Sequence, residues 1–266
     1  MFKAEKLKDY EPSKFQPGYA SIKRNGIHGI YTRDKRIFSR TPGQIVGLNH
    51  LYEPLHRCPF PLVFEIVIPG VDFETCSGII RNFDPAPNAE IHIFNMVHPT
   101  RPFSWRLHQL KRFDEYVLKG HPQIHVEPMH WVANQQDFDQ FYNKVVDDGE
   151  EGACWISPDH VYESGARRWK WMKRVPFKSM EAKIIDILPG TPGKKYEASM
   201  GKMVCELPDG KIVRVGIFKG QTDAWRQKIY DSKENYIGED ITFIYKTLSK
   251  YGIPMQPRFT NFRWDI

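Results

Sequence analysis

Between Ala20 and about Val97 the chain reads as a succession of short strands separated by turns. Each expected strand is apolar, aromatic or alternating, which is typical of a chain that buries one or both faces of a sheet. The expected strands are Ala20–Lys23, Gly29–Thr32, Arg36–Ser39, Leu62–Ile68 and Ile91–Val97. This pattern predicts a β-sheet scaffold for the first part of the chain.

Two later segments have the periodicity of helices. In Trp105–Leu118 and in Asn134–Asp148, apolar residues recur at spacings of three and four, which gathers them on one face of a helix. Together with the preceding strands, these helices predict a first domain of the α+β class.

Beyond Glu181 the pattern changes to strands joined by tight turns, with a turn at residues 208–210. The expected strands are Lys183–Leu188, Lys202–Leu207, Lys211–Phe218 and Ile241–Leu248. A small five-stranded barrel fits this segment. We therefore expect two domains, at residues 1–177 and 178–266.

The composition indicates a globular protein. With 266 residues, of which 41% are hydrophobic, the chain is long enough to bury a substantial core. We expect no membrane association and a cytoplasmic, intracellular location, because no apolar run approaches the roughly 20 residues of a membrane span and no secretory signal opens the chain. The four cysteines are scattered without metal-ligand spacing. Neither a disulfide framework nor a zinc site is expected from them.

Basic residues are concentrated in two segments, in a chain whose formal net charge is +6. Either segment is a solvated charged face or a surface for a polyanion such as nucleic acid. The second segment favours nucleic acid, because its cations alternate with aromatic side chains that can stack on bases. The first segment contains Arg33, Lys35, Arg36 and Arg40. The second contains Arg167, Arg168, Lys170, Lys173, Arg174 and Lys178, interleaved with Trp169, Trp171 and Phe177.

The string Lys23-Arg24-Asn25-Gly26-Ile27-His28 nominates Lys23 as a covalent nucleophile. Taken alone it is weak, because a lysine at a strand end before an Asn-Gly turn is common. Further short strings follow it along the chain. They are Ser39-Arg40, Phe64-Glu65, Ile91-His92-Ile93-Phe94-Asn95, Glu151-Gly152, Lys170-Trp171-Met172-Lys173 and Pro257-Arg258-Phe259 to Arg263-Trp264-Asp265.

In this order and spacing, the strings resemble the motif series of the ATP-dependent DNA ligases over nearly the whole chain, and most closely the compact phage-type enzymes. The resemblance implies a nucleotidyltransferase domain (ATP-grasp-like antiparallel sheets with helices) followed by an OB-fold, with no additional N-terminal DNA-binding domain. It implies ATP as the substrate, a Mg²⁺ or Mn²⁺ requirement, nicked double-stranded DNA as the partner, and a monomer. The product would be a sealed phosphodiester bond, whether the protein acts in a cell or, phage-encoded, in a host cytoplasm.

The resemblance also implies roles for single residues. Lys23 would carry AMP, and two carboxylates, Glu65 and Glu151, would bind the metal. ATP or AMP would contact Ile22, His28, Arg40, Glu65, Phe94, Lys170, Lys173, Arg263 and Asp265. DNA would contact Arg40, Arg167, Arg168 and Arg174.

Structural alternatives remain open for several of these residues. Phe94 is equally well explained as a core residue, and Glu151 as a solvated turn residue. Glu65 stands in an otherwise apolar strand, where an unpaired carboxylate would be costly, so we expect it to have a partner. A structural salt bridge would satisfy it as well as a metal would.

The chain departs from the family pattern at a few positions. Asn25 and His28 stand where the family usually has Asp and Arg, which puts the ribose and phosphate contacts there in question. Lys170 and Lys173 are three residues apart, whereas the family spacing is Lys-x-Lys, so the two lysines would alternate onto opposite faces of a regular strand. One of them is displaced, or Arg174 substitutes for it.

Two other functions remain open at this point. An RNA ligase or an mRNA-capping guanylyltransferase uses the same lysine chemistry and motif order. A noncatalytic DNA-binding protein derived from a ligase would also explain the departures at Asn25 and His28.

Overall fold

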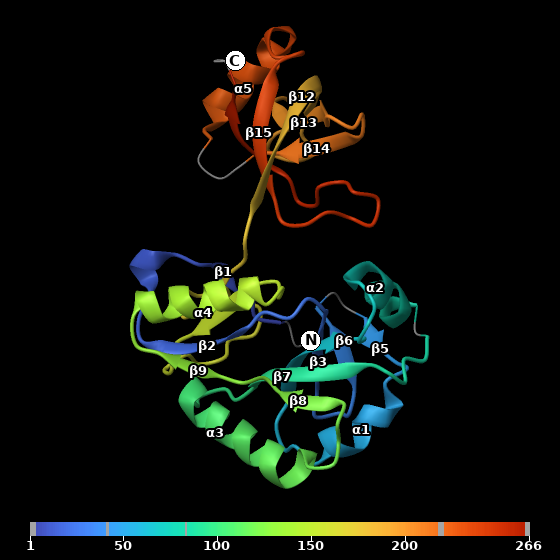
Figure 1. Ribbon diagram of the computed structural model, residues 1–266, viewed down its shortest axis with the longest axis vertical. Coiled ribbons are helices and arrows are strands. Elements are labelled where there is room, and N and C mark those ends of the chain that lie inside the picture. The colour runs from blue at the N-terminus through green and yellow to red at the C-terminus, as the bar shows by residue number, and fades with distance from the viewer. Residues whose placement is uncertain (1–3, 41–42, 83, 218–220, 264–266) are drawn as a thin grey trace. The chain divides into compact units, whose positions relative to one another are not determined.

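The computed structural model describes residues 4–40, 43–82, 84–217 and 221–263. It consists of two compact units, Met1–Val175 and Pro176–Ile266 (Figure 1). The first unit contains two β-sheets and most of the helices, and the second contains a closed β-barrel.

A six-stranded sheet carries the first part of the chain, as the strand pattern predicts. Its strand order is β5-β4-β3-β6-β7-β8, and only the pairing of β7 with β8 is parallel among its described strands. Its strands are β3 (Ile27–Tyr31), β4 (Ile37–Ser39), β5 (Gln44–Ile45), β6 (Leu62–Val67), β7 (Glu90–Met96) and β8 (Ile124–Val126).

A five-stranded sheet has the order β1-β11-β10-β2-β9, so it joins segments from both ends of the first unit. Its strands are β1 (Lys8–Asp9), β2 (Gly18–Ile22), β9 (His130–Val132), β10 (Ala153–Ile156) and β11 (Trp171–Arg174). The chain leaves this sheet at the end of β2 and enters the other sheet at the start of β3. Asn25 and Gly26 therefore connect two sheets and do not close a hairpin.

Helices cover the outer faces of these sheets (Figure 1). The two expected helices are present, although the first starts earlier, at Phe103, and loosens into a π-helical turn over Asp114–Leu118. Two α-helices of this unit were not expected, because one contains Pro54 and the other Gly78, both unfavourable in helix interiors. The helices are a 3₁₀ turn (Pro12–Lys14), α1 (Asn49–His56), α2 (Phe73–Arg81), α3 (Phe103–Phe113) and α4 (Gln135–Asp147).

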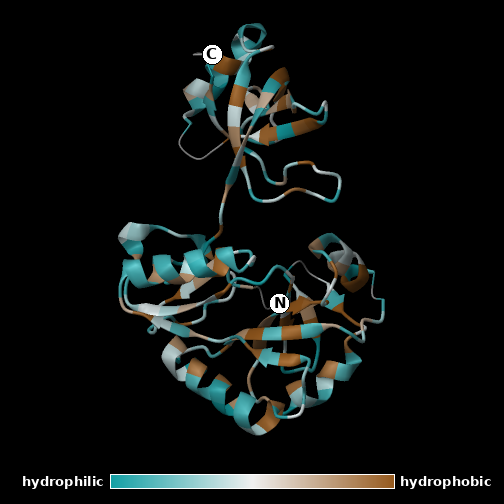
Figure 2. Ribbon diagram, in the orientation of Figure 1, coloured by the Kyte–Doolittle hydropathy of each residue, from teal (hydrophilic) through white to brown (hydrophobic). Residues whose placement is uncertain are grey.

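Two apolar clusters pack against the six-stranded sheet. One face of the six-stranded sheet, including Ile27, Phe64 and Ile91, packs against the helices on its outer side. The opposite face carries Ile30 and Val63, which share a cluster with residues of the five-stranded sheet. In Figure 2 brown is frequent in the strands of the six-stranded sheet, whereas much of α4 is teal. The two sheets therefore face each other across a shared apolar layer.

The second unit is a closed barrel with strand order β12-β13-β14-β16-β15. Gly210, in the turn expected at residues 208–210, has φ +79° and its backbone N–H bonds to the carbonyl of Leu207 at 2.9 Å. The fifth strand, β16, was not predicted. Its residues belong to the string that begins at Pro257, which in the sequence is recognisable only as a motif. The elements are β12 (Lys178–Pro189), β13 (Met200–Glu206), β14 (Ile212–Gly216), α5 (Asp223–Asp231), a 3₁₀ turn (Lys233–Asn235), β15 (Asp240–Tyr245) and β16 (Arg258–Phe262).

Within the described parts of the chain, no helix combines the length and the apolar character that crossing a membrane requires.

Candidate active site

Lys23 immediately follows Ile22, the last residue of β2, and is held at both its backbone and its side chain. Its backbone N–H donates to the carbonyl of Gly152 at 2.8 Å, and its Nζ donates to the carboxylate of Glu151. The side chains of Lys23 and Glu151 are 22% and 25% exposed, so both remain accessible. The segment just before β10 (Ala153–Ile156) thereby places the Glu151 carboxylate in contact with Lys23, 128 positions away in the sequence.

Two glycines allow this approach. At Gly152, where φ is +148°, an added Cβ would lie 2.3 Å from the backbone oxygen of Arg174. At Gly26, an added Cβ would lie 2.3 Å from the backbone oxygen of Ile66. Both distances are far below van der Waals contact. The glycines of the Lys-x-Asn-Gly and Glu-Gly strings are therefore required by close backbone packing.

Glu65 and His28 are cross-strand partners on β6 and β3 and lie on the face directed towards the other sheet. The pKa of the Glu65 carboxyl is raised to about 7, mainly by burial; the charges of Lys23 and Arg40 oppose this rise, and the charge of Glu151 adds to it. A hydrogen bond from the backbone of Gly26 also favours the ionised form. This largely buried carboxylate thus accepts a hydrogen bond from the backbone of Gly26, lies 3.9 Å from His28 and is influenced by the charges of Lys23 and Arg40.

His28 is buried and neutral. Burial, followed by the positive charge of Arg40, lowers its pKa to about 3. Its Nδ1 lies 3.9 Å from a carboxylate oxygen of Glu65. Its Nε2 has no hydrogen-bond partner among the described residues. A buried polar atom without a hydrogen-bond partner destabilises the folded protein. A ligand with a polar group at this position would therefore bind favourably to Nε2.

Phe94 lies on β7 between two other rings of this inner layer. Its ring centroid is 5.8 Å from that of His28 and 5.9 Å from that of Trp171. The side chain is half-buried and packs against the apolar cluster between the sheets. It offers a partly exposed aromatic surface beside Glu65 and His28, and it also contributes to the core.

The two lysines of the lysine-pair motif have different environments. Lys170 precedes β11, is 52% exposed and pairs with Asp159. Lys173 lies within β11, is only 23% exposed and has its Nζ 3.9 Å from a carboxylate oxygen of Asp9. It occupies the same face as Trp171, and its charge, like that of Lys23, lowers the pKa of the half-buried Cys154 thiol, which burial raises. The fold therefore groups Lys173, but not Lys170, with Lys23.

Arg174 lies on the opposite face of β11 from Lys173. Its guanidinium pairs with Asp139 of α4 and stacks 4.0 Å from the ring centroid of Tyr142. This arrangement separates it from the Lys23 group, so it is not placed to substitute for a lysine there.

The remaining basic candidates are near the surface. Arg167 lies 3.5 Å from Asp9, and Arg168 pairs with Glu163 at 2.8 Å. Arg40 is exposed, yet its positive charge lowers the pKa of both His28 and Glu65.

The C-terminal motif belongs to the second unit. Arg263 pairs there with Glu181, and its backbone N–H donates to the carbonyl of Asp240 at 2.9 Å. Asp265 lies outside the described residues.

An ionic cluster next to Lys23 was not anticipated from the sequence. The Arg24 guanidinium lies 3.1 Å from Glu127 and 2.8 Å from Glu150. Glu127 is 2% exposed, and its other neighbour is His92. Glu127 follows β8 (Ile124–Val126) directly, and no pattern of neighbouring residues in the sequence indicates its contact with Arg24.

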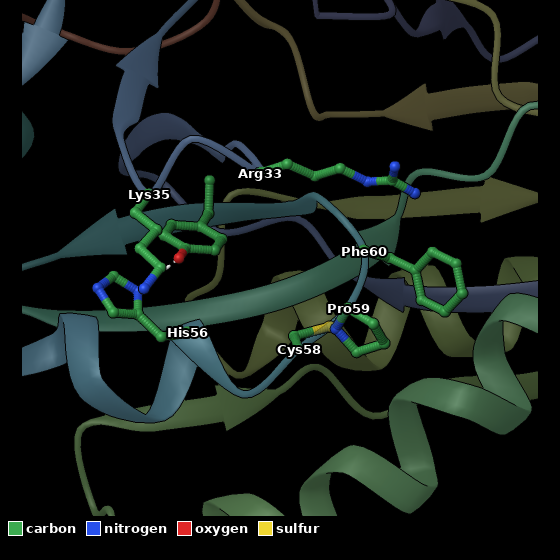
Figure 3. Close-up of a pocket in the computed structure, with 7 residues that line it drawn as sticks. Arg33, Lys35, His56, Cys58, Pro59 and Phe60 are labelled. Atoms are coloured by element: carbon green, nitrogen blue, oxygen red, sulfur yellow. Dashed lines mark hydrogen bonds between the residues drawn. The ribbon is translucent and has the colours of Figure 1, made fainter.

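A separate cavity of about 430 Å³ lies at the far end of β3. Figure 3 shows Arg33, Lys35 and His56 around it, with the Tyr31 hydroxyl hydrogen-bonded to His56. Tyr31 belongs to the cluster on the outer face of the six-stranded sheet. The cavity is therefore on the other face from Glu65 and is not part of the Lys23 group.

Comparisons with known proteins concern the fold of the chain. A model of the DNA ligase OB-like domain family matches residues 192–263. A probable DNA ligase of Aquifex aeolicus (strain VF5) is 23% identical over 175 residues, covering 57% of this chain. The match covers 30% of that relative, so the chain spans about a third of its length.

Two solved structures share the fold along their whole length. A structure from a study of DNA binding by Lig E DNA ligases superposes with a TM-score of 0.79 at 20% identity, covering 99% of this chain and 100% of the other. The ATP-dependent DNA ligase of bacteriophage T7, solved with ATP, gives a TM-score of 0.56 at 19% identity, covering 97% and 98%. The chain thus has the fold of the ATP-dependent DNA ligases, a nucleotidyltransferase domain followed by an OB-fold.

Proposed function

We propose that this chain is an ATP-dependent DNA ligase that seals nicks in duplex DNA through an AMP adduct on Lys23 and a DNA-adenylate. The observation that carries the proposal is the direct contact of Lys23 Nζ with the Glu151 carboxylate. That contact lies beside a second carboxylate, Glu65, whose pKa Lys23 influences. An accessible lysine with two carboxylates around it matches the needs of nucleotidyl transfer.

In the first step, Lys23 Nζ attacks the α-phosphorus of ATP. A bond forms between nitrogen and phosphorus, the bond from phosphorus to the bridging oxygen breaks, and pyrophosphate leaves with the electron pair. The lysine must lose a proton to become nucleophilic. Glu151 already accepts a hydrogen bond from Nζ and is therefore positioned to take this proton.

The adenosine part of the substrate fits the inner layer between the sheets. Phe94 would stack on the base, because its half-buried ring leaves a face available next to His28. The unpartnered Nε2 of His28 would bind a hydroxyl or phosphate oxygen. Ile22, adjacent to Lys23 on β2, would border the nucleotide.

The carboxylates suit a hard divalent cation. Glu65 and Glu151 offer oxygen ligands of the kind that Mg²⁺ and Mn²⁺ prefer, and their charges influence each other electrostatically. When bound, such an ion supplies neutralisation of the phosphate charge. Lys173 would hold the α-phosphate from the same face, and Arg40 would contact the AMP or the DNA end.

DNA would contact the basic surface of both units. Arg167 and Arg168 are near the surface, and the second unit has the OB-fold, which commonly binds nucleic acids. Arg263 and Asp265 would orient the pyrophosphate of ATP. We expect a monomer whose DNA affinity falls steeply with salt concentration, because phosphate contacts release counterions.

The decisive experiment is intact-mass analysis after incubation with ATP and Mg²⁺, followed by addition of a nicked DNA duplex. Wild type should gain one AMP and then lose it as the nick is sealed. Lys23→Ala should gain none, and Lys170→Ala serves as a matched control that should still be labelled.

Parallel reactions with GTP and with nicked RNA separate the related activities. Labelling by GTP alone would overturn the proposal in favour of a capping enzyme. Sealing of RNA alone would replace DNA as the substrate. A wild-type protein that never acquires AMP would be a noncatalytic relative.

A further inference from the structure

Three potential metal ligands converge at the open edge of the six-stranded sheet, where β7 and β8 pair in parallel. They are Glu90, His92 and His125, and their ligand atoms all lie within 4.8 Å of one another. His92 and His125 are direct partners in the register of the two strands. Glu90 is two residues before His92 and shares its face of β7.

The distances between these atoms are close to those of a coordination site. Glu90 Oε2 lies 3.3 Å from His125 Nε2 and 3.9 Å from His92 Nε2. With metal–nitrogen bonds of 2.0–2.1 Å, ligand atoms of a tetrahedral site are about 3.4 Å apart. The two rings stack at 4.7 Å with an angle of 23° between their planes, so small rotations would direct both nitrogens at one ion.

A buried carboxylate supports His92 from behind. Glu127 Oε2 lies 3.5 Å from His92 Nδ1, and Glu127 is itself held by Arg24 at 3.1 Å. A carboxylate at Nδ1 favours the proton on that nitrogen, which leaves the lone pair of Nε2 directed towards Glu90. Histidines that bind metals commonly have such a carboxylate on their second nitrogen.

The site is accessible from solvent. The side chains of Glu90 and His125 are 30% and 40% exposed, whereas that of His92 is 13% exposed. Three protein ligands leave a fourth position free for water or another ligand. Two imidazoles and one carboxylate select borderline transition ions such as Zn²⁺ over Mg²⁺, which prefers oxygen ligands only.

We propose that Glu90, His92 and His125 form a binding site for a divalent transition-metal ion, with Zn²⁺ as the best match, supported by Glu127. The site differs from the Glu65 and Glu151 pair in its donor atoms. From the sequence there was no reason to expect a zinc site built from the four cysteines. The proposed site uses histidine and glutamate ligands instead. The proposal stands whether or not the chain is a ligase.

The test is a titration of the untagged, metal-free full chain with Zn²⁺ against a chromophoric chelator, without ATP or DNA. Wild type should bind one ion tightly. His125→Ala and Glu90→Gln should each weaken binding at least tenfold. His108→Ala, which removes an exposed histidine on α3, should leave it unchanged.

Co²⁺ provides a second readout that reports geometry. Wild type should give the intense visible absorption of a tetrahedral or five-coordinate site, and His125→Ala should lose it. Glu127→Gln should weaken affinity by roughly 10- to 100-fold, the usual effect of removing a carboxylate behind a ligating histidine. The same Zn²⁺ affinity in His125→Ala as in wild type, or displacement of Zn²⁺ by an equal concentration of Mg²⁺, would overturn the proposal.

Discussion

The carboxylate of Glu151 accepts a hydrogen bond from the Nζ of Lys23, and the backbone of the next residue, Gly152, accepts one from the Lys23 N–H. The two residues just before β10 therefore hold both the backbone and the side chain of Lys23. The arrangement makes Glu151 the most direct influence on the reactivity of Lys23 and leads to the first prediction.

Glu151→Gln should slow AMP transfer to Lys23 by on the order of 100-fold or more, because the amide cannot accept the ammonium proton. Single-turnover labelling with ATP measures this rate. Glu150→Gln is the matched control, since its carboxylate contacts Arg24 and not Lys23, and it should change the rate less than tenfold. Equal losses in the two variants would contradict the role of Glu151.

Lys173→Ala should reduce the same rate by about 100-fold, as expected for loss of a cation that stabilises transferring phosphate. Lys170→Ala should remain near wild type, because Lys170 is exposed and pairs with Asp159. Comparing the two variants in the same labelling assay checks the assignment. The reverse order of effects would show that Lys170 is the phosphate ligand.

Glu65→Gln should stabilise the metal-free protein at high pH but not at low pH. The folded-state pKa of Glu65 is about 7, above its ordinary value of 4.5. The folded state therefore binds more protons between these values, and the stability of the wild type falls as pH rises from 4.5 to 7. Glutamine does not titrate, so the variant keeps its stability as pH rises. Above pH 7 its free energy of unfolding should exceed that of the wild type by up to about 3 kcal/mol.

Urea unfolding at pH 5 and at pH 8, with chelator present, measures this difference. Glu53→Gln is the control, because Glu53 is exposed on α1. If the difference in unfolding free energy between Glu65→Gln and wild type is the same at pH 5 and pH 8, the pKa of Glu65 is not raised in the folded state.

Gly26→Ala should destabilise the protein by about 1–3 kcal/mol, because its Cβ would collide with the backbone oxygen of Ile66. Gly78→Ala is an opposite control. Nothing lies within 4 Å of a Cβ at that helical position, so alanine should be neutral or stabilising by up to about 1 kcal/mol. Thermal unfolding of the two variants decides the matter. A stable Gly26→Ala protein would show that the connection between the sheets can shift.

Phe94→Leu should raise the KM for ATP by about tenfold or more, because a base loses its aromatic partner, an interaction of roughly 1–3 kcal/mol. Leucine retains most of the packing against Trp171, so the thermal midpoint should change little. A lower midpoint with an unchanged KM would identify Phe94 as a core residue only.

Local pattern was sufficient for the two longest helices and for nine of the described strands, but of the five-stranded sheet it predicted only β2. Apolar runs predicted β3 and β6, and alternating residues predicted β7, to within two residues at each end, because a strand buried on both faces is apolar almost throughout and one buried mainly on one face alternates. The weaker helices α1 and α2 escaped prediction, since Pro54 and Gly78 mask their periodicity and tertiary packing stabilises them instead.

By itself the sequence determined the nucleophile candidate, the alternation of the strands and the change from an α+β unit to a barrel, because these depend on neighbours along the chain. Only the tertiary structure decided which charges meet. Lys173 is grouped with Lys23, Arg174 is turned to the opposite face, and His92 is brought to His125, through strand registers between distant segments. A one-residue change of register would reverse every one of these facings, and no local pattern carries that information.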